Sequence, residues 1–130
     1  MMVRRIALIY SIAVGALMIV MWSFFIFTGQ VPEFQTTPYA ISLHLFDEFA
    51  TAMLLIVGGI GLIKKSKWAL HVHLISIGML IYTIVVSPGY YLDQGQIYIP
   101  ILFGILLVIA IILSIFTFIR RREFISSSYF

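Results

Sequence analysis

The chain has 130 residues, of which 62% are hydrophobic and 10% are charged, and its formal net charge is +3. A soluble domain of this length could not hide so much apolar surface from water, so the composition excludes an ordinary globular protein and indicates a membrane protein. Because the basic residues flank apolar segments, as in membrane proteins, we expect no nucleic-acid partner. The absence of cysteine excludes disulfides, thiolate metal sites and cysteine redox chemistry.

Four apolar segments follow one another along the chain, over residues 6–27, 39–63, 68–87 and 97–119. Each is long enough to cross a bilayer core of about 30 Å as an α-helix. The first segment follows two arginines and resembles a signal peptide, but its apolar run is too long and no cleavage pattern follows, so we expect it to remain as a helix. The sequence thus predicts an all-α fold, a four-transmembrane-helix bundle that forms a single membrane domain over residues 1–130.

The orientation of the bundle is predicted from its basic residues. All eight lysines and arginines lie near the two chain ends or in the short connection of residues 64–67, which a four-span arrangement places on one side. The other two connections, residues 29–38 and 88–96, carry Glu33 and Asp93 instead. By the positive-inside rule the basic side is cytoplasmic, so we predict a multi-pass cell-membrane protein with both termini in the cytoplasm (N-in/C-in). Residues 126–130 are predicted to form a short disordered end.

A stripe of acidic and histidine residues marks the second segment. His44, Asp47, Glu48 and Thr51 share one face of a helix, because their spacing follows the helical repeat. In a helix that begins near Pro38, Glu48 lies ~15 Å from the outer end, close to the bilayer midplane. A charged side chain there costs at least ~2.5–3.5 kcal/mol, so such residues are functional candidates by default. We interpret the stripe as a ligand-binding or proton-relay site; the alternative is a hydrogen-bonded group that only fixes helix packing.

The third segment carries a second polar stripe. His73, Ser76 and Thr83 recur at helical spacing and are predicted to face the interior of the bundle. His71 lies on a different face and is expected at the membrane interface. Tyr82, in the outer half of the same segment, is the residue that we expect to complete the site of the second segment.

A metal ion is one candidate ligand of that site. His44 and Glu48 are four residues apart on one helix, which is a suitable spacing for two ligands of the same ion. Two ligands do not define a metal site, so the sequence leaves both the metal and any other cofactor unidentified. A haem held by His44 and His73 is rejected within one subunit, since the two histidines differ in depth by ~13 Å.

Two other features are interpreted as structural. Ser11, Gly15, Met18 and Trp22 form a small-residue seam along the first segment, which we attribute to helix packing. The outer connection around residues 87–95 contains a Pro-Gly pair and two tyrosines. It either caps the site of the second segment or forms a tight turn with interfacial tyrosines, and we favour the turn.

Glu48 is followed in the second segment by the glycine-rich stretch Gly58-Gly59-Ile60-Gly61-Leu62 and then by a basic connection into the third segment. This order of features resembles the DoxX-like group of small four-helix membrane proteins, over residues 47 to about 82. The resemblance implies the four-helix fold, and because some DoxX-like proteins are linked to quinone-dependent respiratory oxidoreductases, it also implies a role near quinones. Only Glu48 and the glycines match the family pattern, which assigns neither Asp47 nor the histidines.

Several functions stay open, and the sequence does not decide whether the protein is an enzyme. The first is a membrane binding or redox-accessory protein that holds a small lipophilic ligand, for example a quinone, near His44 and Glu48. The second is a proton or metal-ion transporter or channel that uses Asp47 and Glu48 and acts as a homo-oligomer. Others are an intramembrane enzyme that uses His44 and Glu48 with a metal, and a structural subunit of a larger membrane complex. In every case we expect the lipid bilayer to surround the protein.

Overall fold

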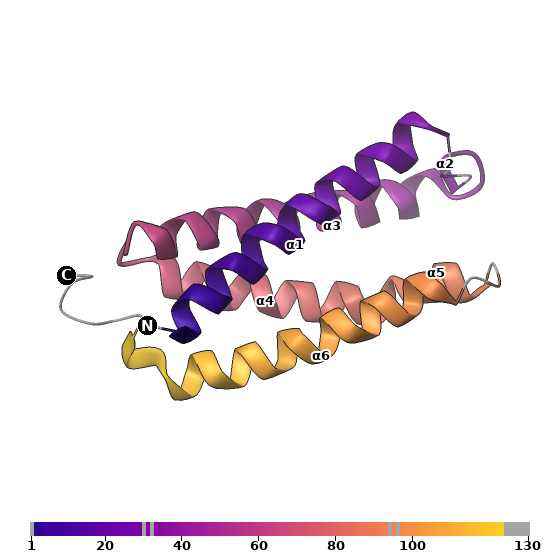
Figure 1. Cartoon of the computed structure of the whole chain (residues 1–130). Coiled ribbons are helices and arrows are strands. Elements are labelled where there is room, and N and C mark those ends of the chain that lie inside the picture. Colours follow the sequence, from indigo (N-terminus) through magenta and orange to yellow (C-terminus); the bar gives the residue numbers. More distant parts are fainter. Residues whose placement is uncertain (1, 30, 32, 94, 96, 124–130) are drawn as a thin grey trace.

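The computed structural model describes residues 2–29, 31, 33–93, 95 and 97–123, and within these residues the protein is helical and has no strand. Its four long helices run roughly along one axis (Figure 1). They are α1 (Met2–Phe27), α3 (Pro38–Ile63), α4 (Ala69–Val86) and α6 (Tyr98–Ile119). Three short helices lie at their ends: α2 (Glu33–Thr36), α5 (Pro88–Asp93) and the 3-10 helix η1 (Arg121–Glu123).

The long helices coincide with the four predicted segments, and each is long and apolar enough to cross a membrane. The predicted all-helical arrangement is therefore confirmed. The outer connection differs from the favoured tight turn, because residues 88–93 form the short helix α5. Pro88 stands at its first position, where proline fits a helix without losing a hydrogen bond. The side chains of its two tyrosines, and the predicted disordered residues 126–130, lie outside the described residues.

The basic residues gather at one end of the bundle. The start of α1, the α3–α4 turn and the end of α6 lie together there, and α2 and α5 lie at the opposite end (Figure 1). All eight lysines and arginines belong to these three segments, so we call this end the basic end. Arg4 also links α1 to α3 at this end, because its Nη1 donates a hydrogen bond of 2.8 Å to the carbonyl oxygen of Leu62 in the last turn of α3.

Glycines let the helices approach closely. A Cβ atom on Gly58 would lie 3.2 Å from the backbone Cα and N of His73, and one on Gly15 would lie 2.8 Å from the carbonyl oxygen of Ala52. The backbones of α3 and α4, and those of α1 and α3, therefore meet almost directly at these points. Toward the opposite end, the α1–α3 pair and the α4–α6 pair draw apart (Figure 1).

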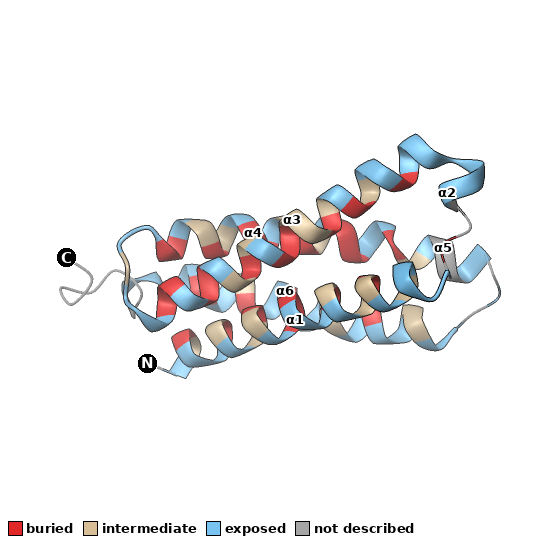
Figure 2. Ribbon diagram, turned by 90° about the horizontal axis from the view of Figure 1, so that it is seen from above, coloured by how far each residue is buried: buried red, intermediate tan, exposed pale blue. Residues whose placement is uncertain are grey.

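Burial follows the inner faces of the helices, and the outer faces are exposed (Figure 2). The central core contains Leu55, Ile77, Leu80 and Phe103 from three of the helices. α6 is the least buried of the four long helices, since only 17% of its most apolar 18-residue stretch lies inside the protein. Its exposed residues are nearly all isoleucine, leucine, valine and phenylalanine, and they form a broad apolar surface.

Candidate functional site

Glu48 lies at the centre of a polar cluster inside the bundle, where its side chain is 4% exposed. Nε1 of Trp22 donates a hydrogen bond to its Oε2 at 3.0 Å. Oγ of Ser87 donates to Oε1 at 2.9 Å, and Oγ1 of Thr83 donates to the same oxygen. Nε2 of His44 lies 3.5 Å from Oε1. We call these five residues the Glu48 cluster. They come from α1, α3 and α4, and Ser87 directly follows the last residue of α4.

The antiparallel pairing of α3 and α4 explains why these residues meet. The two helices touch at Gly58 and His73. Glu48 lies ten residues before Gly58 (58 − 48), and Thr83 lies ten residues after His73 (83 − 73), so both stand at the same level of the bundle. Ser87 is one helical turn beyond Thr83 and lies on the same face.

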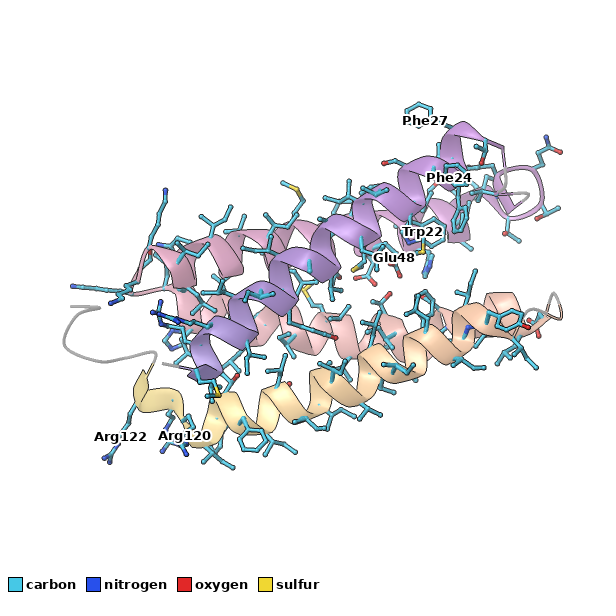
Figure 3. The ribbon with its side chains drawn as sticks, in the orientation of Figure 1. Trp22, Phe24, Phe27, Glu48, Arg120 and Arg122 are labelled. Carbon is cyan, nitrogen blue, oxygen red and sulfur yellow. The ribbon has the colours of Figure 1, made fainter. Side chains whose placement is uncertain are left out.

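Trp22 reaches the cluster from α1. Figure 3 shows Trp22 and Glu48 close together on the side of α1 and α3 that faces α4 and α6. The indole ring also packs edge-on against His44, with ring centroids 5.6 Å apart and an interplanar angle of 75°. A buried tryptophan N–H requires an acceptor, and the carboxylate of Glu48 supplies it. The contact fixes the rotation of α1 relative to α3.

The cluster supplies hydrogen-bond donors to both oxygens of the Glu48 side chain. Trp22 donates to Oε2, and Thr83 and Ser87 donate to Oε1. A typical hydrogen bond contributes about 0.5–1.5 kcal/mol to stability, and loss of one partner leaves the other buried without one. The three donors therefore stabilise the position of Glu48 inside the bundle.

A groove leads from this cluster to the side of the bundle, between α1 and α6. Its unfilled space, the open mouth included, is about 490 Å³. Among the described residues, its polar lining consists of Glu48, Thr83 and Ser87, and the other walls are apolar. Leu17 on α1 is 46% exposed and Leu102 on α6 is 43% exposed, so they mark its mouth. The remaining lining residues are Val14, Met18, Met21, Leu80, Ile84, Phe103 and Leu106.

The structure brings only part of the predicted site together. His44 and Glu48 are neighbours, but Asp47 is partly exposed and does not line the groove. Thr51 is fully buried, and its Oγ1 has no hydrogen-bond partner among the described residues. Tyr82 does not complete the site, because its side chain is 66% exposed on the outer face of α4. One residue on a helix turns the direction by 100°, so Thr83 points inward where Tyr82 points outward.

The second predicted stripe divides between two places. Thr83 joins the Glu48 cluster, whereas Nδ1 of His73 is hydrogen-bonded to Oγ of Ser11 at 3.0 Å, nearer the basic end. Ser76 donates to the carbonyl oxygen of His73 within α4, at 2.7 Å. His73 and Thr83 are about 15 Å apart along the helix axis, so the Ser11–His73 pair is separate from the cluster.

Trp22 was predicted only as part of a packing seam, and Ser87 as the first residue of a connection for which a turn was favoured over a cap on the site. The sequence did contain a signal for both, since a tryptophan in an apolar helix needs an acceptor for its N–H, and Ser87 continues the face of Thr83. The expected metal ligands His44 and Glu48 do approach each other. Within the described residues, however, no group of three or more His, Cys, Asp or Glu side chains is placed to hold a metal ion.

The chain matches the family described as "Domain of unknown function (DUF8058)" over residues 1–128, and it therefore belongs to this family. No curated protein and no solved structure matches it. None of these comparisons links the chain to DoxX-like proteins, and that resemblance stays a prediction.

The contribution of the cluster to stability can be measured with a matched pair of threonine variants. Thr83→Val removes a donor to the buried Glu48 and is expected to lower the free energy of unfolding by about 1–3 kcal/mol. Thr51→Val makes the same change at an equally buried threonine with no recorded partner and is expected to be neutral or slightly stabilising. Denaturant unfolding of both variants in detergent checks this, and equal losses for the two would contradict the hydrogen-bond assignment.

Proposed function

We propose that the protein is an integral membrane protein that binds a small lipophilic ligand in the groove that ends at Glu48, as a binding or redox-accessory subunit. The observation that carries the proposal is the combination of an apolar, laterally open groove with a polar cluster at its inner end. Pockets for small molecules have this composition: mostly apolar walls and a few converging polar groups.

The membrane setting is supported by the exterior of the bundle. α6 has a mean hydropathy of 3.1 but is mostly exposed, and apolar residues also cover the outer faces of α1, α3 and α4. Soluble monomers rarely expose apolar patches above a few hundred Å², so this surface fits lipid rather than water. The mouth of the groove, between Leu17 and Leu102, would then open to the hydrocarbon, and a lipophilic ligand would enter from the bilayer.

Ligand binding is favoured over an ion pathway by the position of the two carboxylates. The alternative of a proton or metal-ion transporter or channel uses Asp47 and Glu48 together, but Asp47 is partly exposed and does not line the groove. Glu48 instead accepts hydrogen bonds from three side chains at the end of an apolar groove. A quinone stays one candidate ligand, as the resemblance to DoxX-like proteins implies.

Two neighbouring carboxylates provide a matched test of the proposal. Glu48→Gln and Asp47→Asn each replace a carboxyl group of α3 by an amide, but only Glu48 lies at the groove. Lipophilic molecules that co-purify with the wild-type protein are extracted and quantified by mass spectrometry. We expect Glu48→Gln to retain at least about tenfold less of the bound molecule, because a buried polar contact is lost, and Asp47→Asn to retain the wild-type amount. Equal retention in both variants, or no stoichiometric molecule in the wild type, would count against the proposal.

We also propose that the basic end faces the cytoplasm, which the positive-inside rule supports. The chain has no cysteine, so single cysteines can report the side directly. Gln35→Cys on α2 and Lys67→Cys in the α3–α4 turn place one exposed thiol at each end. In intact cells a membrane-impermeant maleimide is expected to label the first, and to label the second only after permeabilisation. The reverse pattern would mean the opposite orientation.

A further inference from the structure

We infer that the groove selects a ligand whose headgroup donates hydrogen bonds over one whose headgroup only accepts them. The inference rests on the proposed function and narrows the class of ligand: a hydroxyl-bearing head, such as an alcohol or a hydroquinone, is preferred to a quinone. It follows from the donors and acceptors that the Glu48 cluster still has available at the groove.

The donors of the cluster are already used by Glu48. The single hydroxyl hydrogen of Thr83 and that of Ser87 both point to Oε1, and the indole hydrogen of Trp22 points to Oε2. Neither Trp22 nor His44 lines the groove. A ligand head that enters the groove therefore meets only Glu48, Thr83 and Ser87, whose free capacity consists of oxygen lone pairs.

This arrangement favours a ligand headgroup that can donate a hydrogen bond to the cluster over one that can only accept. A hydroxyl of the ligand can donate to a lone pair of Ser87, Thr83 or Glu48, in a low-dielectric setting where such bonds are strong. A quinone carbonyl placed at the same point would face acceptors only, so its oxygen would be buried without a partner. A protonated amine shares the donor chemistry of the hydroxyl and would also be attracted by the carboxylate of Glu48.

The oxygens of Glu48 accept the hydrogen bonds of the cluster, and this sets the direction of those bonds. Because the N–H of Trp22 can only donate, a glutamine at position 48 must place its oxygen toward Trp22 and its NH2 group toward Thr83 and Ser87. The two hydroxyls would then accept from the amide, and their own hydrogens would be free to point into the groove. Glu48→Gln should therefore convert the groove from an acceptor surface into a donor surface while it keeps the shape of the side chain.

The test uses probes that differ only in the head. A decyl-substituted benzoquinone and the hydroquinone obtained from it by prior reduction with dithionite share one scaffold, and decylamine supplies a charged donor. Their affinities for the full chain in lipid nanodiscs are measured anaerobically by calorimetry, with empty nanodiscs subtracted. For the wild type we expect the hydroquinone to bind at least about tenfold tighter than the quinone. In Glu48→Gln we expect the preference for the hydroquinone over the quinone to disappear or reverse. In the control Asp47→Asn we expect the same preference as in the wild type.

Each outcome either supports or overturns the inferred preference for donor headgroups. The inference is supported if the wild type binds either donor head more tightly than the quinone and Glu48→Gln loses this preference. Comparison of the hydroquinone with decylamine then shows whether the preferred donor is neutral or charged. If the quinone binds the wild type as tightly as both donors, but Glu48→Gln still loses the co-purified ligand, the inference is overturned and the proposed function stands. A preference that survives in Glu48→Gln also overturns the inference. If no probe binds and no ligand co-purifies, both are overturned.

Discussion

The structure depends on one requirement: a carboxylate buried on the inner face of α3 needs hydrogen-bond donors inside an apolar bundle. The backbone of a helix cannot supply them, because its N–H groups are used internally, so the donors come from side chains on other helices. Trp22 brings α1 to Glu48, and Thr83 and Ser87 bring α4. The same carboxylate therefore sets the mutual rotation of three helices and forms the inner end of the groove. Apolar packing alone leaves such rotations weakly specified, since many faces of these helices are equally hydrophobic.

The helices contact one another differently in the two halves of the bundle. Near the basic end the backbones meet through Gly58 and His73, and Arg4 binds the last turn of α3. In the half that carries α2 and α5, the helix pairs draw apart (Figure 1). There, hydrogen bonds from Thr83 and Ser87 to Glu48 connect the two pairs. α6 contributes apolar walls to the groove but no polar group. The closely packed half near the basic end thus adjoins a half in which the helix pairs are apart and the groove lies between α1 and α6.

The sequence predicted the helices well because their signal is local: four long apolar runs and the turns between them. It also predicted that Glu48 and His44 lie together, as the structure has them, since a carboxylate within an apolar helix is conspicuous wherever it faces. The partners of Glu48 were harder to predict, because they depend on how three helices are rotated and aligned. The step of 100° between adjacent residues separates Thr83 from Tyr82, and Glu48 from Asp47, and an apolar sequence does not say which of the two points inward. Trp22 was attributed to packing for the same reason, since its acceptor lies on another helix.

The central claim is that a ligand lies in the groove with its head at Glu48. The most direct measurement is a crystal structure of the protein purified with its native lipids and grown in a lipidic mesophase. We predict density for an elongated molecule between α1 and α6, with a polar atom of its head within about 3.2 Å of a side-chain oxygen of Glu48, Thr83 or Ser87. A groove closed by its own side chains, or one filled only by a lipid tail with the headgroup elsewhere, would contradict the claim.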